Sequence, residues 1–347
     1  MRVFIGVDVS LASSAICILD DAGNVISEAK IASDPEAFVS FMRDVPHEIT
    51  GIGMEAGPLS QWLYEGLASA GLNPVLMETR LVKKVLDASP VKTDRRDAQG
   101  IARLLQCGWY REVHCKSVTA QETRALLTGR SGLKKAIIGL ELSLRGVLRN
   151  FGLKMGQISK RDYDARVQEL VFGNDMLRDV ALPILQARSE LRKQLATLER
   201  QVRSKAKEDP VCRKLMTMPG IGPVVALTYR AAIDDPTRFR RSKDIGPWVG
   251  LTPRLDESGE RSVVGNISKY GDVSLRSALY QAANIMLNRG GENWLKTWAL
   301  QLVQRCGNRR KAKVALARRI GVVLHRMWVD NTDFQYFRSE ATTPSLA

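Results

Sequence analysis

The sequence predicts a mixed α/β domain at the N-terminus, two long helices in the middle and a mainly helical, basic domain at the C-terminus. Three observations support this. Short apolar runs separated by turn residues fill the first third of the chain, leucines recur at steps of three and four through the middle, and basic residues gather toward the end. At 347 residues the chain is also long enough for more than one hydrophobic core.

The N-terminal part begins with three strands joined by short connections, at residues 3–9, 13–20 and 25–32. Helical periodicity and further apolar runs then alternate. The elements expected after the third strand are a helix at 34–45, a strand at 49–57, a helix at 59–71, a strand at 73–79 and helices at 80–88 and 94–106. This order suits a ribonuclease H-like or actin-like α/β domain over residues 1–112.

The middle, residues 113–209, is predicted to be a coiled-coil insertion. The steps of three and four are typical of a coiled-coil stripe. The first long helix carries Leu126, Leu133, Ile137, Leu140, Leu144, Val147 and Phe151, and the second carries Leu191, Leu195, Leu198 and Val202. A polar region with Gly152, Gly156, Gly173 and Pro183 lies between them. The helices fold back as an antiparallel pair or form a dimer seam; the alternative is that each packs one face on a domain core.

The C-terminal part, residues 210–347, opens with PVCRKLMTMPGIGPVVA. Here Pro219, Gly220 and Gly222 interrupt helical sequence, as in a helix-hairpin-helix motif, in which glycines let backbone N–H groups approach a phosphate. A plain turn between two helices would use the same residues. Next we expect a loop, LTPRLDESGERSVVGNIS, then helices at 273–289 and 292–304 and a basic helix, NRRKAKVALARRIGVVLHRMW.

The charge indicates a polyanionic partner. Residues 211–347 hold 22 Lys and Arg against 11 Asp and Glu, which is +11 of the formal +15. Such a surface favours phosphate backbones through counterion release, although basic composition alone also occurs in proteins that bind no nucleic acid. The scattered cysteines and histidines match no zinc or disulfide pattern. No apolar run is long enough to cross a membrane, and we expect a cytoplasmic, nucleoid-associated protein.

Two acids lie in apolar strands, where an ionised carboxylate is costly to bury without compensation. They are Asp8 and Glu55, and in a ribonuclease H-like sheet their strands are neighbours. Asp94 and Asp97, in VKTDRRDAQGIA, share one face at the start of a predicted helix. Capping by Thr93 or Asp94 explains that pair when it is taken alone. Together with the strand acids, the pair favours a Mg²⁺ site, because Mg²⁺ prefers carboxylate and water oxygens.

An actin-like sugar kinase would need a later glycine-rich phosphate loop, and no D-x-G-G-G run follows. The set IGVDVS, GMEAG, KTDRRDA, MPGIGPVVA and GLTPRLDESGERSVVGNISKYGDVSLRSALYQAA instead resembles the DEDD insertion-sequence transposases of the IS one-ten family, relatives of the Piv/MooV invertases. The resemblance covers nearly the whole chain. One departure is the Glu-Ala-Gly-Pro at 55–58, where the family often has Thr-Gly after Glu-Ala.

The resemblance implies a RuvC-like N-terminal domain, a coiled-coil linker and a C-terminal transposase domain. It implies that Asp8, Glu55, Asp94 and Asp97 hold Mg²⁺, or Mn²⁺ in its place, and that Ser258 in Asp-Glu-Ser-Gly forms a phosphoserine link with DNA. Without the resemblance Ser258 would be taken for a turn residue. The expected nucleic-acid contacts are Gly220, Gly222, Arg254, Arg261 and Lys269.

The resemblance further implies a guide non-coding RNA that pairs with donor and target DNA, and a homo-oligomer between dimer and tetramer. The function expected is therefore RNA-guided, site-specific strand cleavage and rejoining. Two alternatives are a RuvC-type metal-dependent junction nuclease without a protein–DNA bond, and a non-catalytic nucleic-acid-binding protein. The first would not need Ser258; the second would tolerate replacement of Asp8 and Glu55.

Overall fold

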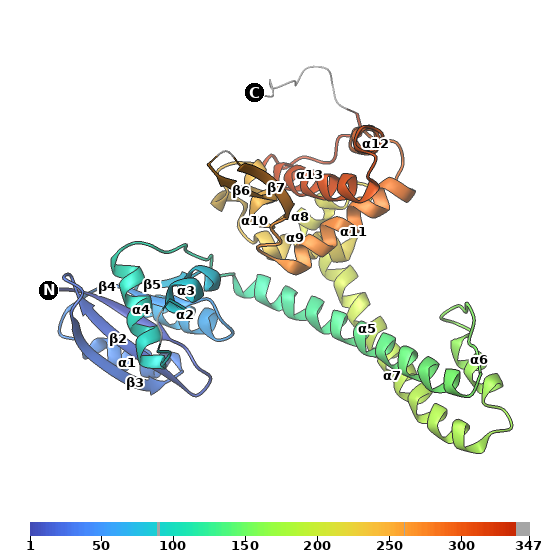
Figure 1. Cartoon of the computed structure of the whole chain (residues 1–347), viewed down its shortest axis with the longest axis horizontal. Helices are drawn as coiled ribbons and strands as arrows, with labels where there is room; N and C mark the ends of the chain where they lie inside the picture. The colour runs from blue at the N-terminus through green and yellow to red at the C-terminus, as the bar shows by residue number, and fades with distance from the viewer. Residues whose placement is uncertain (89–90, 260, 338–347) are drawn as a thin grey trace. The chain divides into compact units, whose positions relative to one another are not determined.

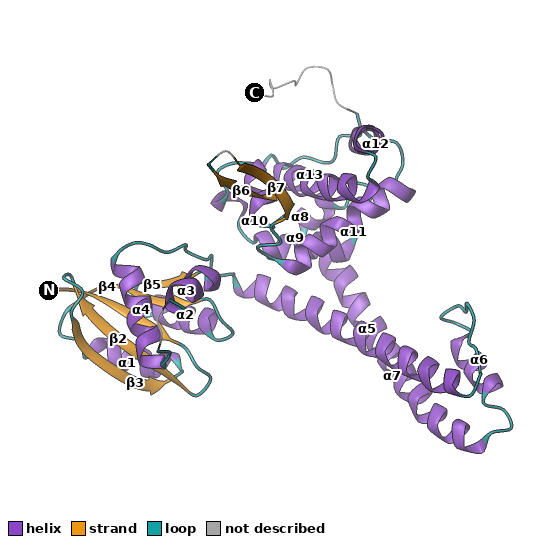
Figure 2. Ribbon diagram, viewed as in Figure 1, coloured by secondary structure: helices purple, strands orange, loops and turns teal. Residues whose placement is uncertain are grey.

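The computed structural model describes residues 1–88, 91–259 and 261–337, and the chain divides into two compact units, residues 1–116 and 117–347 (Figure 1). The first unit is mixed α/β and the second is mainly helical (Figure 2). Both match the predicted fold classes. No helix among the described residues has the length and apolar content needed to cross a membrane.

The first unit is built on a five-stranded sheet with the order β3-β2-β1-β4-β5. Its strands are β1 (Arg2–Asp8), β2 (Ser13–Asp20), β3 (Val25–Ala32), β4 (Glu48–Glu55) and β5 (Pro74–Met77). Its helices are α1 (Pro35–Arg43), α2 (Ser60–Ser69), α3 (Thr79–Leu86) and α4 (Asp94–Gln106). β1 is antiparallel to β2 and parallel to β4, which is parallel to β5. The predicted elements are confirmed, and the arrangement is compatible with a ribonuclease H-like domain.

Alternation along β1 assigns its side chains to two faces of the sheet. Val3, Ile5 and Val7 are buried in one core with α1 and α2. Gly6 faces α4, and a Cβ there would lie 2.1 Å from the carbonyl oxygen of Ala98 and 2.3 Å from the backbone nitrogen of Ala102. The absence of a side chain at Gly6 therefore lets the helix backbone rest directly on the strand.

The second unit begins with two long helices, α5 (Val118–Asn150) and α7 (Asp175–Glu208), with the short α6 (Tyr163–Leu170) at their far end (Figure 1). Arg130 pairs with Glu199 at 2.8 Å and Glu141 pairs with Arg188 at 2.8 Å. Because the partner number falls as the α5 number rises, α5 and α7 are antiparallel, as one of the two predicted arrangements required. Arg188 is buried and also binds Asp164 of α6 at 2.7 Å.

The predicted leucine stripe is only partly a helix–helix seam. Ile137 and Leu144 are buried, but Phe151 is 59% exposed, and Leu126 and Val202 pack in the C-terminal core. The expectation that Pro183 lies between the helices was wrong: it lies inside α7. Asn174 caps that helix by accepting from the Leu177 N–H, and an interior proline costs one backbone hydrogen bond without ending the helix. Knobs-into-holes packing stays a prediction.

The rest of the second unit is a helical core around α9 (Pro223–Ile233), most of which is buried. Tyr229 of this helix donates to the carbonyl oxygen of Gly321 at 2.7 Å. The elements around it are α8 (Pro210–Leu215), 3₁₀ turns η1 (Pro236–Arg238) and η2 (Ser242–Asp244), α10 (Ile245–Trp248), α11 (Val273–Arg289), α12 (Trp294–Cys306) and α13 (Arg309–Val329).

The predicted loop over residues 251–268 was wrong, because it forms a β-hairpin of β6 (Pro253–Ser258) and β7 (Arg261–Ile267). Polar residues obscured the pattern. Leu255, Val263 and Val264 favour strands on either side of Gly259, whose positive φ of 56° suits a tight turn. Glu260 lies outside the described residues.

We predict that Gly6→Ala destabilises the first unit. The added Cβ meets helix backbone, which cannot rotate away as a side chain can, so we expect a loss of about 1–3 kcal/mol or more in the free energy of unfolding. Urea unfolding measures it. Gly51→Ala on β4 is the matched control, because its Cβ would make only ordinary van der Waals contacts, with the Leu105 side chain at 3.5 Å and the Asn73 carbonyl oxygen at 3.7 Å. Equal stability of the two variants would contradict the proposed close contact.

We also predict acid sensitivity at His325. Burial lowers the pKa of this histidine below 6.5; its Nδ1 lies 3.0 Å from the Ser242 hydroxyl and its Nε2 3.0 Å from the Pro236 carbonyl oxygen. The unfolded chain then binds the proton first, so the free energy of unfolding should fall as pH drops through about 6.5. His325→Gln should flatten that part of the curve in thermal melts. An unchanged slope would contradict the role of His325.

Candidate functional site

The first candidate site lies where β1 and β4 end. The two strands are parallel neighbours, with Val7 opposite Met54, so Asp8 and Glu55 end them at the same edge of the sheet. Alternation places both acids on the face that carries Gly6 and Gly53, which is the face that α4 covers. In each of the segments Gly-Val-Asp and Gly-Met-Glu, the glycine allows close contact with the helix and the acid lies two residues further along on the same face.

The start of α4 supplies the other two acids. Thr93 caps the helix by accepting from the Arg96 N–H at 3.3 Å, which confirms the capping expectation for Thr93. Asp97 is half-buried and Asp94 is exposed. Arg95 forms an ion pair with Glu28 of β3. This ion pair connects the start of α4 to the sheet.

The carboxylates influence one another electrostatically. Burial raises the pKa of Asp8, and the nearby charges of Asp97 and Asp94 raise it further, while Lys92 opposes the shift. Burial also raises the pKa of Glu55, opposed by a hydrogen bond with Thr79, with Asp8 and Asp97 adding to the increase. Ionised carboxylates that lie close together in a partly desolvated place repel one another, and a bound cation would relieve that repulsion.

This donor set fits a divalent ion in its chemistry. Among the described residues, no three His, Cys, Asp or Glu side chains stand close enough together to hold a metal ion without rearrangement. Mg²⁺ does not require a complete protein cage, because it keeps several waters and is often held by one or two carboxylates plus substrate phosphates. Asp8 and Glu55, whose pKa values are raised by burial and by neighbouring carboxylates, provide such oxygen ligands.

Thr79 and Lys92 were not among the predicted site residues. The Thr79 hydroxyl donates to the Ala56 carbonyl oxygen at 2.9 Å and reaches Glu55, and it begins the helix that follows β5. The position of Thr79 directly after a buried strand was the feature of the sequence that could have identified it as a site residue. Lys92 supplies positive charge to both strand acids.

The second candidate site is the β6–β7 hairpin. Ser258 ends β6 opposite Arg261 on β7, and both side chains are exposed. Arg254 donates to the Ser268 carbonyl oxygen at 3.3 Å and lies over the Tyr270 ring at 5.3 Å. Together with Lys269, Arg254 also lines a cavity of about 450 Å³ beside the hairpin. The hairpin thus carries Ser258, Arg254 and Arg261, and Lys269 follows shortly after the end of β7.

The glycines of the predicted helix-hairpin-helix motif play different structural parts. Gly220 has a φ of 86°, and a Cβ there would lie 2.8 Å from the Ala282 carbonyl oxygen of α11, so close packing requires glycine. Gly222 caps the N-terminus of α9 and has open space where a Cβ would be. Phosphate binding by this turn stays a prediction. Of the two glycines, Gly222 is the one with open space beside its backbone where a phosphate could approach.

We predict that Asp8→Asn stabilises the metal-free protein, because a raised pKa means that the ionised carboxylate is less stable in the folded state than in the unfolded state. The gain in free energy of unfolding should shrink as pH falls toward 3.8, because the folded wild-type carboxyl takes up its proton above that value. Added Mg²⁺ should raise the melting temperature of wild type more than that of the variant. Exposed Asp44→Asn is the control; an equal gain there would contradict this explanation.

Comparison with known proteins agrees with this arrangement. Residues 5–152 match the DEDD transposase family model of IS110 type, and residues 212–299 match the family described as transposase IS116/IS110/IS902. The chain is 29% identical over 320 residues to the transposase for insertion sequence element IS1111A of Coxiella burnetii, covering 90% of this chain and 86% of that protein. It is 30% identical over 259 residues to a probable family 20 transposase of Pseudomonas aeruginosa, covering 71% and 73%.

The first family match covers the acidic sheet edge and continues through α5 of the second unit, and the second covers C-terminal helices and the hairpin. The relatives carry transposase names and align with most of the chain. The chain belongs to the IS110, or IS one-ten, family of insertion-sequence transposases, enzymes that act on DNA.

Proposed function

We propose that this transposase is an RNA-guided, site-specific DNA recombinase that cleaves and rejoins strands through a covalent serine intermediate. The observation that carries the proposal is the group of acids at one sheet edge, where burial and neighbouring carboxylates raise the pKa of Asp8 and Glu55. We assign Mg²⁺ binding to Asp8, Glu55, Asp94 and Asp97.

When bound, a divalent ion would neutralise charge on a phosphate and polarise its oxygens. The protein's own part is to hold the oxygen ligands in place. Thr93 caps α4 and so orients Asp97, while close packing at Gly6 sets the helix beside the strand ends. Thr79 restrains Glu55 through its hydrogen bond. Lys92 adds a cation that can meet a DNA phosphate once the acids are neutralised.

Ser258 is the proposed nucleophile. Its exposure at the end of β6 leaves the hydroxyl open to a phosphodiester. Attack forms a bond between Oγ and phosphorus and breaks a bond between phosphorus and a deoxyribose oxygen; the serine proton passes to a base, and the released sugar oxygen takes up a proton. Arg261, opposite Ser258, is suited to balance the phosphate charge. A hydroxyl of the second strand then displaces serine.

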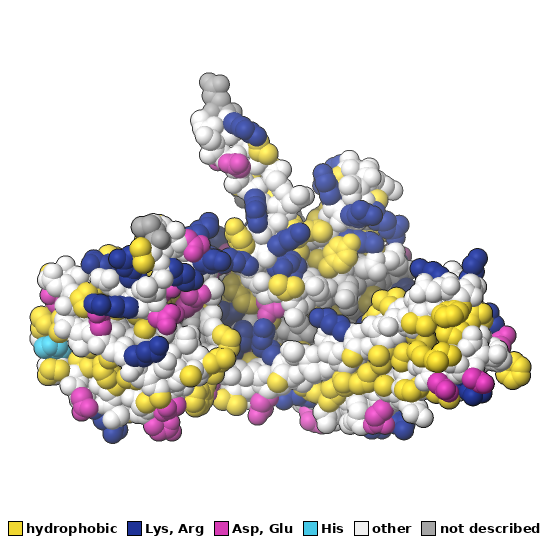
Figure 3. All heavy atoms as spheres, turned by 60° about the horizontal axis from the view of Figure 1, so that its bottom comes forward, with side chains coloured by type: hydrophobic (Ala, Val, Ile, Leu, Met, Phe, Trp, Pro, Cys, Tyr) yellow, Lys and Arg dark blue, Asp and Glu magenta, His cyan; other side chains and the backbone are white. Residues whose placement is uncertain are grey.

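The proposed partners are element-end and target DNA, a guide RNA and further copies of the chain. The excess of +11 over residues 211–347 supports binding to nucleic acid. The helical arm formed by α5, α6 and α7 exposes apolar side chains, seen in yellow in Figure 3. They include Leu142 at 63%, Phe172 at 91% and Met176 at 73% exposure, which supports the proposal that coiled-coil packing between copies builds a dimer or tetramer.

The experiment that tests this function combines the protein, RNA from its native flanking sequence, Mg²⁺ and element-end DNA labelled on one strand. Denaturing gels before and after protease should show a protease-sensitive adduct with wild type. The adduct should disappear in Ser258→Ala and in Asp97→Ala. Ser262→Ala is the matched control on the same hairpin, and we expect it to keep the adduct.

Other outcomes separate the alternatives. Free cleaved ends that persist in Ser258→Ala but vanish in Asp97→Ala would replace the proposal with a RuvC-type nuclease that activates water. Binding without cleavage by any protein, wild type included, would favour a non-catalytic role. Adduct formation in the absence of RNA would contradict the proposal that a guide RNA is required.

A further inference from the structure

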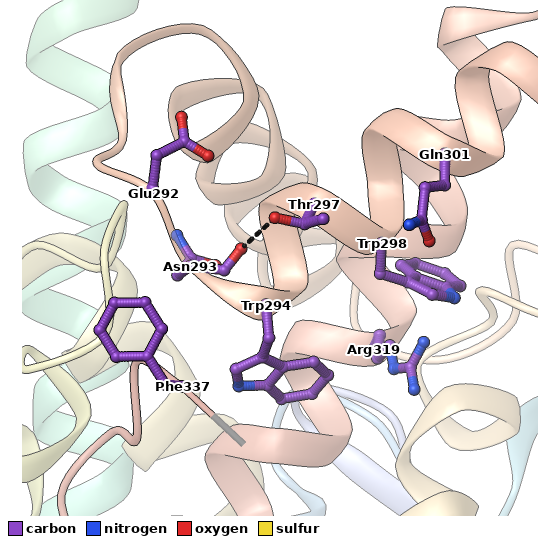
Figure 4. A pocket seen from close by; sticks show the side chains of 8 residues that line it. All are labelled: Glu292, Asn293, Trp294, Thr297, Trp298, Gln301, Arg319 and Phe337. Atoms are coloured by element: carbon purple, nitrogen blue, oxygen red, sulfur yellow. Dashed lines mark hydrogen bonds between the residues drawn. The ribbon is translucent and has the colours of Figure 1, made fainter. Parts of the chain in front are cut away.

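A cluster of aromatic side chains in the C-terminal unit lies outside the sites described above. Trp294 and Trp298 stand one turn apart on α12 and so share a face of that helix. The Arg319 guanidinium of α13 lies over both rings, 4.3 Å from the centre of the Trp298 ring and 5.2 Å from that of Trp294. Figure 4 shows these groups around a common space with Phe337.

The space is a cavity of about 440 Å³, within the range of about 300–1,000 Å³ that small-ligand sites use. Rings from Trp294, Trp298 and Phe337 line part of it, and the polar side chains of Thr297 and Gln301 line another part. Aromatic faces beside groups that can form hydrogen bonds suit a flat ligand with polar edges.

The walls of the cavity are held by the fold. The Trp294 indole N–H donates to the Gln335 carbonyl oxygen at 3.0 Å, and its backbone N–H donates to the Tyr336 carbonyl oxygen at 3.2 Å. Buried Asn293 caps α12 by accepting from the Lys296 N–H at 3.0 Å. Leu295 and Ala299 of the same helix are fully buried, so the opposite face anchors α12 in the core. The tryptophans are thereby presented on a rigid helix.

Arg319 is the basic side chain on the cavity lining, and the other basic residues of its helix are not part of that lining. Glu292, the acid on the same lining, is paired with Lys296 at 2.9 Å. The helix that supplies Arg319 contains no acidic residue along its length. Its basic side chains include Arg309, Arg310, Lys311, Lys313 and Arg318. A ligand that joins a planar ring to phosphates satisfies both the aromatic walls and this charge.

We infer that this cavity receives an unpaired nucleobase of a single strand, stacked on Trp298, while α13 attracts the adjoining phosphates. The inference rests on the proposed function only in that the protein handles nucleic acid; it needs neither the metal site nor Ser258. The inference adds a nucleobase-binding site to the two sites predicted from the sequence, which are the acidic sheet edge and the hairpin.

The test uses the full chain without Mg²⁺, so that binding is measured without cleavage. The probes are labelled single strands of thymidine or of uridine about 12 nucleotides long, and a DNA duplex without unpaired bases, followed by fluorescence anisotropy. Trp298→Leu should weaken binding of a single strand about tenfold, within the range for loss of one stacked base, and leave duplex binding unchanged. Trp298→Phe keeps a ring and should stay within about threefold of wild type.

The matched control is Trp109→Leu, an exposed tryptophan of the first unit, which should bind like wild type. Phe337→Leu is a second variant at a side chain that is 78% exposed; it tests the cavity even where Trp298→Leu fails to fold, and should weaken strand binding about threefold. Whether the variants lose affinity for the DNA strand or for the RNA strand identifies which nucleic acid supplies the base. The inference would be overturned if folded Trp298→Leu bound both single strands as tightly as wild type does. If Trp298→Leu does not fold, the same result with Phe337→Leu would overturn it. An equal loss of affinity for the duplex would also overturn it.

Discussion

The acidic site depends on one contact, the approach of α4 to the middle of the sheet at Gly6. A side chain at this position would overlap the backbone at Ala98 and Ala102, so the helix can lie against β1 only because glycine is there. Gly53 gives the adjacent strand a similar gap, where a Cβ would meet the flexible end of Met77. Since side chains alternate, the acids two residues further along both strands emerge on the same side, beneath the start of the helix.

Placing carboxylates together in a basic protein carries an electrostatic cost, visible in the raised pKa of Asp8 and Glu55. Lys92 offsets part of it, and the ion pair of Arg95 with Glu28 holds the start of α4 to the sheet. Retaining this repulsion makes physical sense where a cation and a phosphate are to be bound, because the same charges that oppose each other in the free protein become ligands.

The C-terminal unit solves a different problem, which is to present polar and aromatic groups on the surface of a well-packed helical core. Tyr229 and the helices around it form that core, and the β6–β7 hairpin and the Trp294–Trp298 face lie on its exterior. The arm is held together by the buried guanidinium of Arg188, which joins α5, α6 and α7 through Glu141 and Asp164. The helical core thus carries both the hairpin and the helix face that we propose contact nucleic acid.

The sequence by itself determined the order of elements in the first unit, the cap at Thr93 and the membership of a transposase family, because local periodicity, capping and shared motifs are written along the chain. It took the β6–β7 hairpin for a loop, because polar residues obscured a local strand-turn-strand pattern, and it placed Pro183 between the long helices, whereas this proline lies inside α7. Tertiary structure alone revealed that Arg95 is paired and that Arg319 meets Trp294 and Trp298 from another helix. Contacts between residues far apart in sequence follow from how faces pack, which no local pattern encodes.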